Sequence, residues 1–437
     1  MTAATRRAVW WLTAITDRIP PRYRFGHWTR LMDRLALRDG LPSIPHTVST
    51  PAPSPIARTS TSPSIRCALI AGSLDTGGIE AVVARLATGL AAHGIGVEVI
   101  CTGGGRTAVA LRAAGIPVHE VSPTEVGATL TRLQPAAVQL HRVENVLMTA
   151  VEPFATRTVM VFHAMESYLN DAHWAQLRDL TARAAPSVAV SDAVSEFFGQ
   201  RLGDRDVRVI VNGVPTPPPP DPGARDAARA RVGALLGVDL AEDLVVLGLQ
   251  RFSDQKNAAG VVDAFLRAAE RMPRLRLIVA GRPDSWLEVR RAELLRRGHP
   301  AGDRVHLLGD SEPELLLCAA DLFALDSFAE GGPVAAVEAV AAGLPVVVSD
   351  VGFARRLVAD DARRGEVVAR ANADMTQRSI ARQRARHHQD NREGFADALV
   401  RVATLVAASG ATVRLPAEFT ESEMVAAHAR LLREVAR

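Results

Sequence analysis

The sequence predicts an α/β protein of two domains, each built on a doubly wound parallel sheet. From residue 66 onwards, apolar segments of strand length alternate with amphipathic helical segments, which is typical of parallel sheets covered by helices. A proline-rich stretch, PTPPPPDPG at 215–223, interrupts the alternation once and cannot continue either element. Because 437 residues exceed what one ordinary core requires, we interpret the interruption as a domain boundary.

The first 65 residues do not share this alternation. Residues 1–40 are rich in Arg, with Trp10, Trp11 and Trp28 interleaved, and are predicted to form one or two short helices. Residues 41–65 are rich in Pro, Ser and Thr and hold too little apolar surface to fold, so they are predicted to be a linker. The basic extension could lie on an anionic membrane surface or pack as a helix on the main body, and the sequence leaves both open.

Residues 66–212 are predicted to form an N-terminal domain. Its strand candidates are RCALIAGSL, VEVICTGG, IPVHEVS, AAVQLHR, TVMVFH, SVAVS and VRVIVNG. The helical segments between them include IEAVVARLATGLAAHG, whose apolar residues recur with a period of about 3.6 and which ends at Gly94. Residues 213–223 then form the predicted interdomain linker.

Residues 224–415 are predicted to form a second domain of the same kind. Its strand candidates are LVVLGLQR, RLRLIVAG, VHLLG, LFALDS and PVVVSD. From about residue 371 the chain becomes helical and Arg-rich, and residues 416–437 hold a last amphipathic helix for which Thr420 or Ser422 is the candidate N-cap. The result is two Rossmann-like domains joined by a proline linker.

Composition excludes several classes of protein. No apolar run of eighteen or more residues suggests a transmembrane helix, and no signal peptide is expected at the N-terminus. Cys67, Cys101 and Cys318 lie far apart in apolar segments, which favours a reducing cytoplasm over disulfides or a zinc site. The net charge of +3 permits anionic partners, but no nucleic-acid-binding motif is present.

The cations of this chain are almost all arginine. Lys and Arg total 51, and Lys256 is the single lysine. An ammonium is a compact point charge, whereas a guanidinium is a rigid planar fork, so the two are not interchangeable at a site. The exception indicates a specific ligand for Lys256, with chance survival of one lysine as the alternative.

Four groups of residues fall at predicted strand ends, where open α/β sheets bind ligands. Gly77 and Gly78 follow Asp75 after the first strand and precede a helix. Glycines let the backbone approach a ligand, and a helix N-terminus favours anions. A plain strand-to-helix turn is the alternative.

His163 ends the strand candidate TVMVFH, with Glu166 in the segment that follows. A histidine there could hydrogen-bond a ligand hydroxyl, act as an acid or base, or be a satisfied core residue. The pair His141-Arg142, after an earlier strand, is a weaker candidate.

Arg251 and Lys256 belong to the third group, RFSDQKN, after the first strand of the second domain. Two cations five residues apart flank a loop that opens a helix. One planar fork, one point charge and helix-terminal amides suit a diphosphate, with a surface ion pair as the alternative.

Glu330 and Glu338 frame the fourth group, EGGPVAAVE. Pro333 suits the first turn of a helix, and Gly331 and Gly332 leave the backbone amides uncovered. Glu330 can reach a sugar hydroxyl, and Glu338 can take vicinal hydroxyls such as those of ribose. Acids beside an anion site need a neutral polyol as their ligand, and a sugar nucleotide supplies both the anion and the polyol. A capped helix with incidental acids is the alternative.

Asp204 and Asp206 match the D-x-D pattern of metal-dependent sugar transfer. They precede a late strand of the first domain, among Arg205 and Arg208 and away from the other groups. We interpret them as a solvated turn, so no metal site is predicted.

These motifs make the chain resemble the retaining GT-B glycosyltransferases of the family-four type, also called glycosyl transferases group 1. Glu330 to Glu338 resembles their E-x7-E element, and Arg251 with Lys256 resembles their G-R-L-x-x-x-K-G loop. The first domain is similar to theirs in GG at 77–78, His163, the segment VAVSDAVSEFF and VNGV at 211–214. The resemblance covers about residues 66–436.

The chain departs from the family pattern at several positions. Gln250 stands where Gly usually precedes the Arg, and Gly332 stands where an aromatic usually follows Glu-Gly. Val211 and Pro215 flank Asn-Gly where Pro and Asp are common, and the turn GFAR at 352–355 lacks a frequent Pro-Glu pair. The first two departures touch the donor pocket, and none removes a charged group.

The resemblance implies two domains facing across a cleft, with the acceptor on the N-terminal side, the donor on the C-terminal side, and a last helix that returns to the first domain. It implies a hexosyltransferase that uses a nucleotide-diphosphate sugar with retention, without metal or further cofactor. By the resemblance, Arg251 and Lys256 neutralise the leaving diphosphate, and Glu338 binds the ribose. Glu330 orients the donor sugar together with Gly331, Gly332, Pro333 and Val334. His163 contacts the sugar near the reacting carbon, and Gly77 and Gly78 border the diphosphate or the acceptor.

Other functions stay open. The sites could bind a nucleotide sugar without turnover, or serve another GT-B reaction such as that of an epimerase. A phosphorylase would need a pyridoxal-phosphate lysine, and a dehydrogenase would need a glycine fingerprint that is missing. The acceptor, whether lipid-linked, a cell-envelope glycan or a natural product, is not encoded in any motif. We expect a cytoplasmic protein, with contact at the inner membrane face through residues 1–40 as the open alternative.

Overall fold

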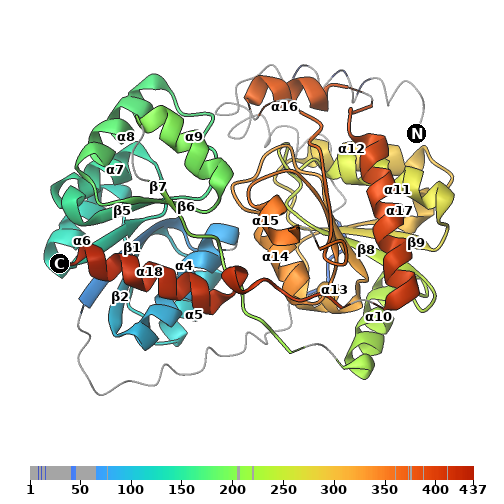
Figure 1. Cartoon of the computed structure of the whole chain (residues 1–437), viewed down its shortest axis with the longest axis horizontal. Helices are drawn as coiled ribbons and strands as arrows, with labels where there is room; N and C mark the ends of the chain where they lie inside the picture. Colours follow the sequence, from blue (N-terminus) through green and yellow to red (C-terminus); the bar gives the residue numbers. More distant parts are fainter. Residues whose placement is uncertain are drawn as a thin grey trace. The chain divides into compact units, whose positions relative to one another are not determined.

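The computed structural model describes the chain from residue 65 to its end with few gaps. The described residues are Ala8, Trp11, Ile15 and 41–45, 65–75, 77–203, 207–218, 221–359, 361–372, 374, 376–386, 388–410 and 412–437. They divide into two units, one that holds 65–215 with 416–437 and one that holds 41–45 with 216–415. Figure 1 shows both units as sheets covered by helices.

The N-terminal unit contains a seven-stranded sheet in the order β3-β2-β1-β4-β5-β6-β7. Each neighbouring pair is parallel. The strands are β1 Ile65–Ser73, β2 Ile95–Gly103, β3 Val118–Glu120, β4 Ala137–Leu140, β5 Thr158–Phe162, β6 Ser187–Ala189 and β7 Val207–Val209. The strand order reverses between β1 and β4, so the chain leaves these two neighbouring strands in opposite directions. In open α/β sheets, ligand-binding loops gather at the carboxyl ends of such strands.

Helices cover both faces of this sheet. They are α4 Gly78–Gly89, α5 Arg106–Ala113, α6 Val126–Leu133, α7 Asn145–Val151, α8 Asp171–Arg183 and α9 Asp192–Leu202. The predicted stop of the first helical segment is confirmed, because Gly94 has a φ of 71°, a conformation that favours glycine.

The last helix, α18 (Glu421–Val435), belongs to the N-terminal unit although it ends the chain. Its Met424, Val425 and Leu432 are buried in one core cluster with side chains of α4, and Figure 1 shows α18 beside α4. Thr420 caps the helix by accepting a bond from the Glu423 N–H at 3.4 Å, as predicted. Next to the cap, Val214 forms a parallel bridge with Thr420.

The C-terminal unit contains a six-stranded parallel sheet in the order β10-β9-β8-β11-β12-β13. The strands are β8 Leu244–Leu249, β9 Leu275–Ala280, β10 Val305–Leu308, β11 Leu322–Leu325, β12 Val346–Ser349 and β13 Gly365–Val368. Its helices are α10 Pro222–Leu236, α11 Ala258–Arg271, α12 Trp286–Arg297, α13 Pro313–Ala319, α14 Val334–Ala341, α15 Ala354–Val358, α16 Gln377–Arg384 and α17 Arg392–Ser409. The order reverses beside β8, so the loops after β8 and β11 are neighbours.

Two features of this unit differ from the sequence expectation. The strand β13 was not predicted, since its four residues GEVV alternate too briefly to stand out. Residues 41–45, expected to be linker, pack on the unit: Gly309 N–H donates to Pro42 at 2.8 Å, Ile44 N–H donates to Ser311 at 3.0 Å, and Ile44 is only 3% exposed. Ile44, these hydrogen bonds and Leu41, which packs on the core of the unit, hold this short segment beyond β10.

Candidate donor site

The loop after β8 carries the two predicted cations. Arg251 donates to Asp284 at 2.6 Å, and Arg282 donates to the same carboxylate at 3.1 Å. Phe252 is buried, and its N–H donates to the carbonyl of Arg282 at 3.0 Å. The loops after β8 and β9 are therefore held together, with the guanidinium of Arg251 about half exposed. Asp284, which orients it, was not predicted.

Lys256 lies at the end of the same loop and contacts Glu330, which follows β11. The Nζ atom of Lys256 donates to Oε1 of Glu330, and Ser327 donates to the same oxygen at 2.9 Å. Both side chains are largely buried, 18% exposed for Lys256 and 8% for Glu330. The structure thus brings together two predicted residues that lie 74 positions apart.

Asn257, the residue after Lys256, belongs to a second, buried group of hydrogen-bonded side chains. Asn257 has a φ of 51° and donates to Asp326 at 3.0 Å and to Gln389 at 2.8 Å. Arg392 and Asn391, at the start of α17, donate to the same Asp326 at 2.9 and 2.8 Å. A left-handed conformation is costly for most residues, and asparagine bears it best when its side chain is bonded. This network holds the backbone directly after Lys256, and its partners were not predicted from the sequence.

Gly331 and Gly332 follow Glu330 and lead into α14. In the described part of the chain, no protein acceptor receives a hydrogen bond from their amide N–H groups; Gly331 is buried and Gly332 is partly buried. Pro333 is the N-cap, so the helix begins at Val334, one residue later than the pattern suggested. Glu338 lies half-buried one turn along α14. Carboxylate, amides and ammonium therefore converge at the carboxyl ends of β8 and β11.

The other predicted residues lie in the N-terminal unit. Gly77 is the N-cap of α4, and a Cβ there would come within 2.4 Å of the Glu80 carboxylate. Asp75 accepts a bond from the Arg106 N–H at 3.2 Å, which ties this turn to the start of α5. The backbone at Gly77 therefore lies close to the Glu80 carboxylate. Thr76, between Asp75 and Gly77, lies outside the described residues.

His163, directly after β5, shares a hydrogen bond of 2.9 Å with His141, directly after β4. Burial lowers the pKa of His163 to about 3, with His428 and Arg142 adding to the effect, and burial also lowers the pKa of His141. Both rings are neutral near pH 7. A neutral ring of such low basicity is a poor proton acceptor, so hydrogen bonding suits His163 better than acid–base chemistry.

No metal site joins these residues: among the residues described, no group of three or more His, Cys, Asp or Glu side chains could hold a metal ion. Asp204 and Asp206 lie outside the described residues. Cys67, Cys101 and Cys318 are free thiols. In the same described part, no helix is both long and apolar enough to cross a membrane.

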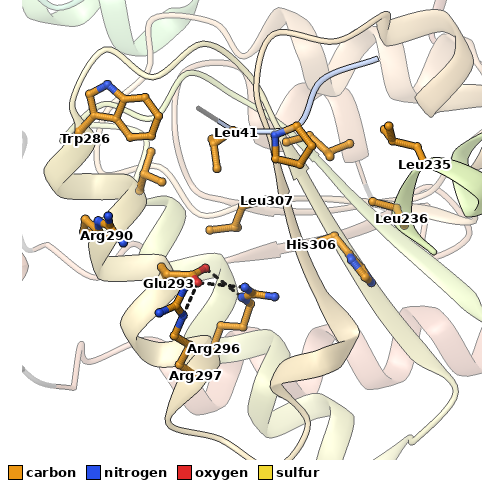
Figure 2. A pocket seen from close by; sticks show the side chains of 13 residues that line it. Leu41, Leu235, Leu236, Trp286, Arg290, Glu293, Arg296, Arg297, His306 and Leu307 are labelled. Carbon is orange, nitrogen blue, oxygen red and sulfur yellow. Dashed lines mark hydrogen bonds and ion pairs between the residues drawn. The ribbon is translucent and has the colours of Figure 1, made fainter. Parts of the chain in front are cut away.

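A cavity of about 360 Å³ lies beside α12 and β10, and no predicted site residue lines it. Figure 2 shows Trp286 and Leu41 on one side and Glu293, bonded to Arg296 and Arg297, on another. Burial alone would raise the pKa of Glu293, but its bonds from the two arginines outweigh burial and lower it. Arg290 lines the same cavity, so arginines outnumber carboxylates among its lining residues.

Two family models match this chain, one in each unit. The model of glycosyl transferases group 1 matches residues 239–388, and that of glycosyltransferase family 4 matches residues 76–217. Together they cover more than half of the chain. The chain belongs to glycosyltransferase family 4. Its first matched motif region begins at the Gly77 turn, and its second contains both donor-loop cations and Glu330.

Individual relatives match a smaller part of the chain than the family models do. The D-inositol 3-phosphate glycosyltransferase of Mycolicibacterium smegmatis is 35% identical over 144 residues, which is 32% of this chain and 31% of that relative. The chain thus matches about a third of that relative's length.

Solved structures show that the fold is GT-B. Anabaena HepE in complex with UDP-glucose has a TM-score of 0.65 at 19% identity, covering 85% of this chain and 100% of its own. WaaG, a glycosyltransferase involved in lipopolysaccharide biosynthesis, has a TM-score of 0.56 at 16% identity, covering 84% and 99%. The expected α/β architecture of two Rossmann-like domains is confirmed.

Proposed function

We propose that this glycosyltransferase moves a hexose from a nucleotide-diphosphate sugar to an acceptor, with its donor site at Lys256 and Glu330. The observation that carries the proposal is the convergence of an ammonium, a carboxylate and two amide N–H groups without protein acceptors at one sheet edge. Amides and ammonium suit a diphosphate and sugar oxygens, and the carboxylate suits a sugar hydroxyl. The UDP-glucose complex of the similarly folded HepE agrees with a ligand of this class.

In the proposed reaction, the bond from the sugar's anomeric carbon to the diphosphate oxygen breaks while an acceptor hydroxyl bonds to that carbon and gives its proton to the leaving diphosphate. Negative charge grows on the leaving diphosphate, and Arg251 and Lys256 are preorganised cations that would stabilise it without a bound metal. Glu330 and Glu338 would bind hydroxyls of the sugar and of the ribose. Retention of configuration, and a contact of His163 with the sugar, rest on the family resemblance.

The donor is the first thing to test. We expect a thermal-shift screen against UDP-, GDP- and ADP-sugars to raise the Tm of the wild type with at least one of them, because ligands that bind only the folded state stabilise it. A response from none of the three classes would contradict the proposal.

A non-catalytic nucleotide-sugar-binding protein, or an epimerase, is the second candidate. Incubation of the bound donor with candidate acceptors, followed by detection of free nucleoside diphosphate, separates the two. We expect release that depends on the acceptor. Binding without acceptor-dependent release under any acceptor class would favour the second candidate.

We also propose peripheral contact of residues 1–40 with the cytoplasmic face of an anionic membrane. Ala8, Trp11 and Ile15 are helical and exposed, and their spacing of three and four residues places them on one helix face. Arginine and tryptophan around them suit an anionic interface. Co-sedimentation with phosphatidylglycerol vesicles should retain the full chain and lose a chain without residues 1–40; a full chain that ignores the vesicles excludes this contact.

A further inference from the structure

The loop that presents the two unpaired amides packs against a ring from a different loop. A Cβ placed on Gly332 would lie 2.3 Å from Cε1 of Phe353 and 2.9 Å from its Cδ1. Phe353 follows β12 and is only 1% exposed. Its ring therefore occupies the space that a side chain at position 332 would need.

The two loops are in backbone contact as well. A Cβ on Gly352, whose φ is 54°, would lie 2.6 Å from the carbonyl oxygen of Gly331. Ser349, at the end of β12, donates to the carbonyl of Ser327 at 2.8 Å, and Ser327 in turn donates to Glu330. The loop after β12 thus supports the loop after β11 along its length.

This packing explains one departure of the sequence from the family pattern. Position 332 lacks the usual aromatic, and the turn at 352–355 carries Phe353. The ring is present in the site, but it enters from the loop after β12. A glycine at 332 is then a steric requirement, because overpacking a filled site forces backbone shifts.

We propose that Phe353 is a positioning residue of the donor site: its ring fixes the Gly331–Gly332 backbone so that the two amides face the donor sugar. This inference rests on the proposed function. It assigns the amides to the sugar and leaves the diphosphate to Arg251 and Lys256. Disturbing the ring should therefore lower the affinity for a nucleotide sugar more than the affinity for the corresponding free nucleoside diphosphate.

The test uses four variants of the full chain: Gly332→Ala, Phe353→Leu, Gly332→Phe, and the exchange Gly332→Phe with Phe353→Gly. Phe265→Leu is the matched control, since Phe265 is equally buried in α11 of the same unit. Affinities for UDP-glucose and UDP, and for GDP-mannose and GDP, are measured by titration calorimetry below the Tm of every variant.

We expect Gly332→Ala and Phe353→Leu to bind the nucleotide sugar about tenfold more weakly, with at most about a threefold change for the nucleoside diphosphate. Phe265→Leu should lower the Tm without changing either affinity. Gly332→Phe alone should lower the Tm by several degrees, and the exchange should restore both the Tm and the sugar affinity, because one ring again fills one space.

Four results would overturn the inference. Equal losses for nucleotide sugar and nucleoside diphosphate would show a general disturbance of the unit. Unchanged sugar affinity in Phe353→Leu and Gly332→Ala, with normal binding by the wild type, would remove the role of the ring and leave the proposed function intact. An exchange variant no more stable than Gly332→Phe alone would contradict the packing itself. A wild type that binds no UDP-, GDP- or ADP-sugar would end the proposed function and this inference together.

Discussion

Each cation of the donor site is held by a carboxylate of the protein. Lys256 contacts Glu330, and Arg251 contacts Asp284, so each cation is oriented by a carboxylate. An ammonium with three donors can keep the Glu330 bond while it turns another N–H to a phosphate oxygen. A guanidinium in the same largely buried position would impose a planar fork and a longer reach.

Lys256→Arg is therefore expected to lose at least about tenfold in donor affinity while the Tm stays near that of the wild type. Calorimetric titration of the donor found in the screen, with the melting curve of each variant, checks this. Arg274→Lys is the matched control, because Arg274 is exposed and pairs with exposed Glu242. Wild-type affinity in Lys256→Arg would remove the phosphate assignment.

Among the elements, α18 stabilises the N-terminal unit through a buried histidine as well as through apolar packing. His428 on α18 shares a hydrogen bond of 3.0 Å with Gln139 of β4, and burial lowers its pKa to about 4. Burial likewise lowers the pKa values of His141 and His163. All three rings stay neutral in the folded unit at a pH where the unfolded chain already binds protons.

The sign of the pH dependence follows. Because the folded pKa values lie below the unfolded value of about 6.5, the unfolded chain takes up more protons as the pH falls, so stability is present above pH 6.5 and is lost toward pH 4. Each histidine contributes a slope of at most about 1.4 kcal/mol per pH unit. His428→Gln, which can still accept the bond from Gln139, should reduce the slope by about a third.

Urea unfolding at pH 7, 6 and 5, followed by Trp174 fluorescence in a chain whose other tryptophans are phenylalanine, measures this slope. His173→Gln is the control, since His173 lies at the partly exposed start of α8, where its ring shares a hydrogen bond with Asn170. Its slope should equal that of the wild type. A His428→Gln slope as steep as the wild-type slope would exclude α18 as an acid-sensitive element.

At the scale of the whole molecule, the N-terminal extension divides into two parts with different roles. Residues 41–45 belong to the C-terminal unit, with Ile44 buried and its backbone bonded to Ser311 and Glu312. Deleting residues 1–45 should therefore lower the Tm of this unit by several degrees, because burial of one isoleucine is worth about 1.5–3 kcal/mol. Deleting residues 1–40 keeps that segment and should change the Tm little.

Calorimetric melting of both truncations and of Ile44→Ser in the full chain checks this difference. Ile44→Ser should resemble the longer deletion. If both truncations melt at the same temperature, the packed segment contributes nothing to stability.

The sequence by itself determined the strands, most helices and the charged groups of the site. Apolar periodicity is a local property, so segments such as LVVLGLQR and TVMVFH were readable without knowledge of the fold, whereas GEVV of β13 was too short. Arg251, Lys256 and Glu330 were found because each follows an apolar strand in a chain otherwise poor in lysine.

Only the tertiary structure decided which of these residues touch. Lys256 meets Glu330 because β8 and β11 are adjacent in the sheet, and Phe353 fills the space beside Gly332 because β12 lies next to β11. The Asn257–Asp326–Arg392 network joins three segments in the same way. Strand order depends on the packing of the whole unit, and no local pattern records it, so the partners of the site residues could not be read from the residues alone.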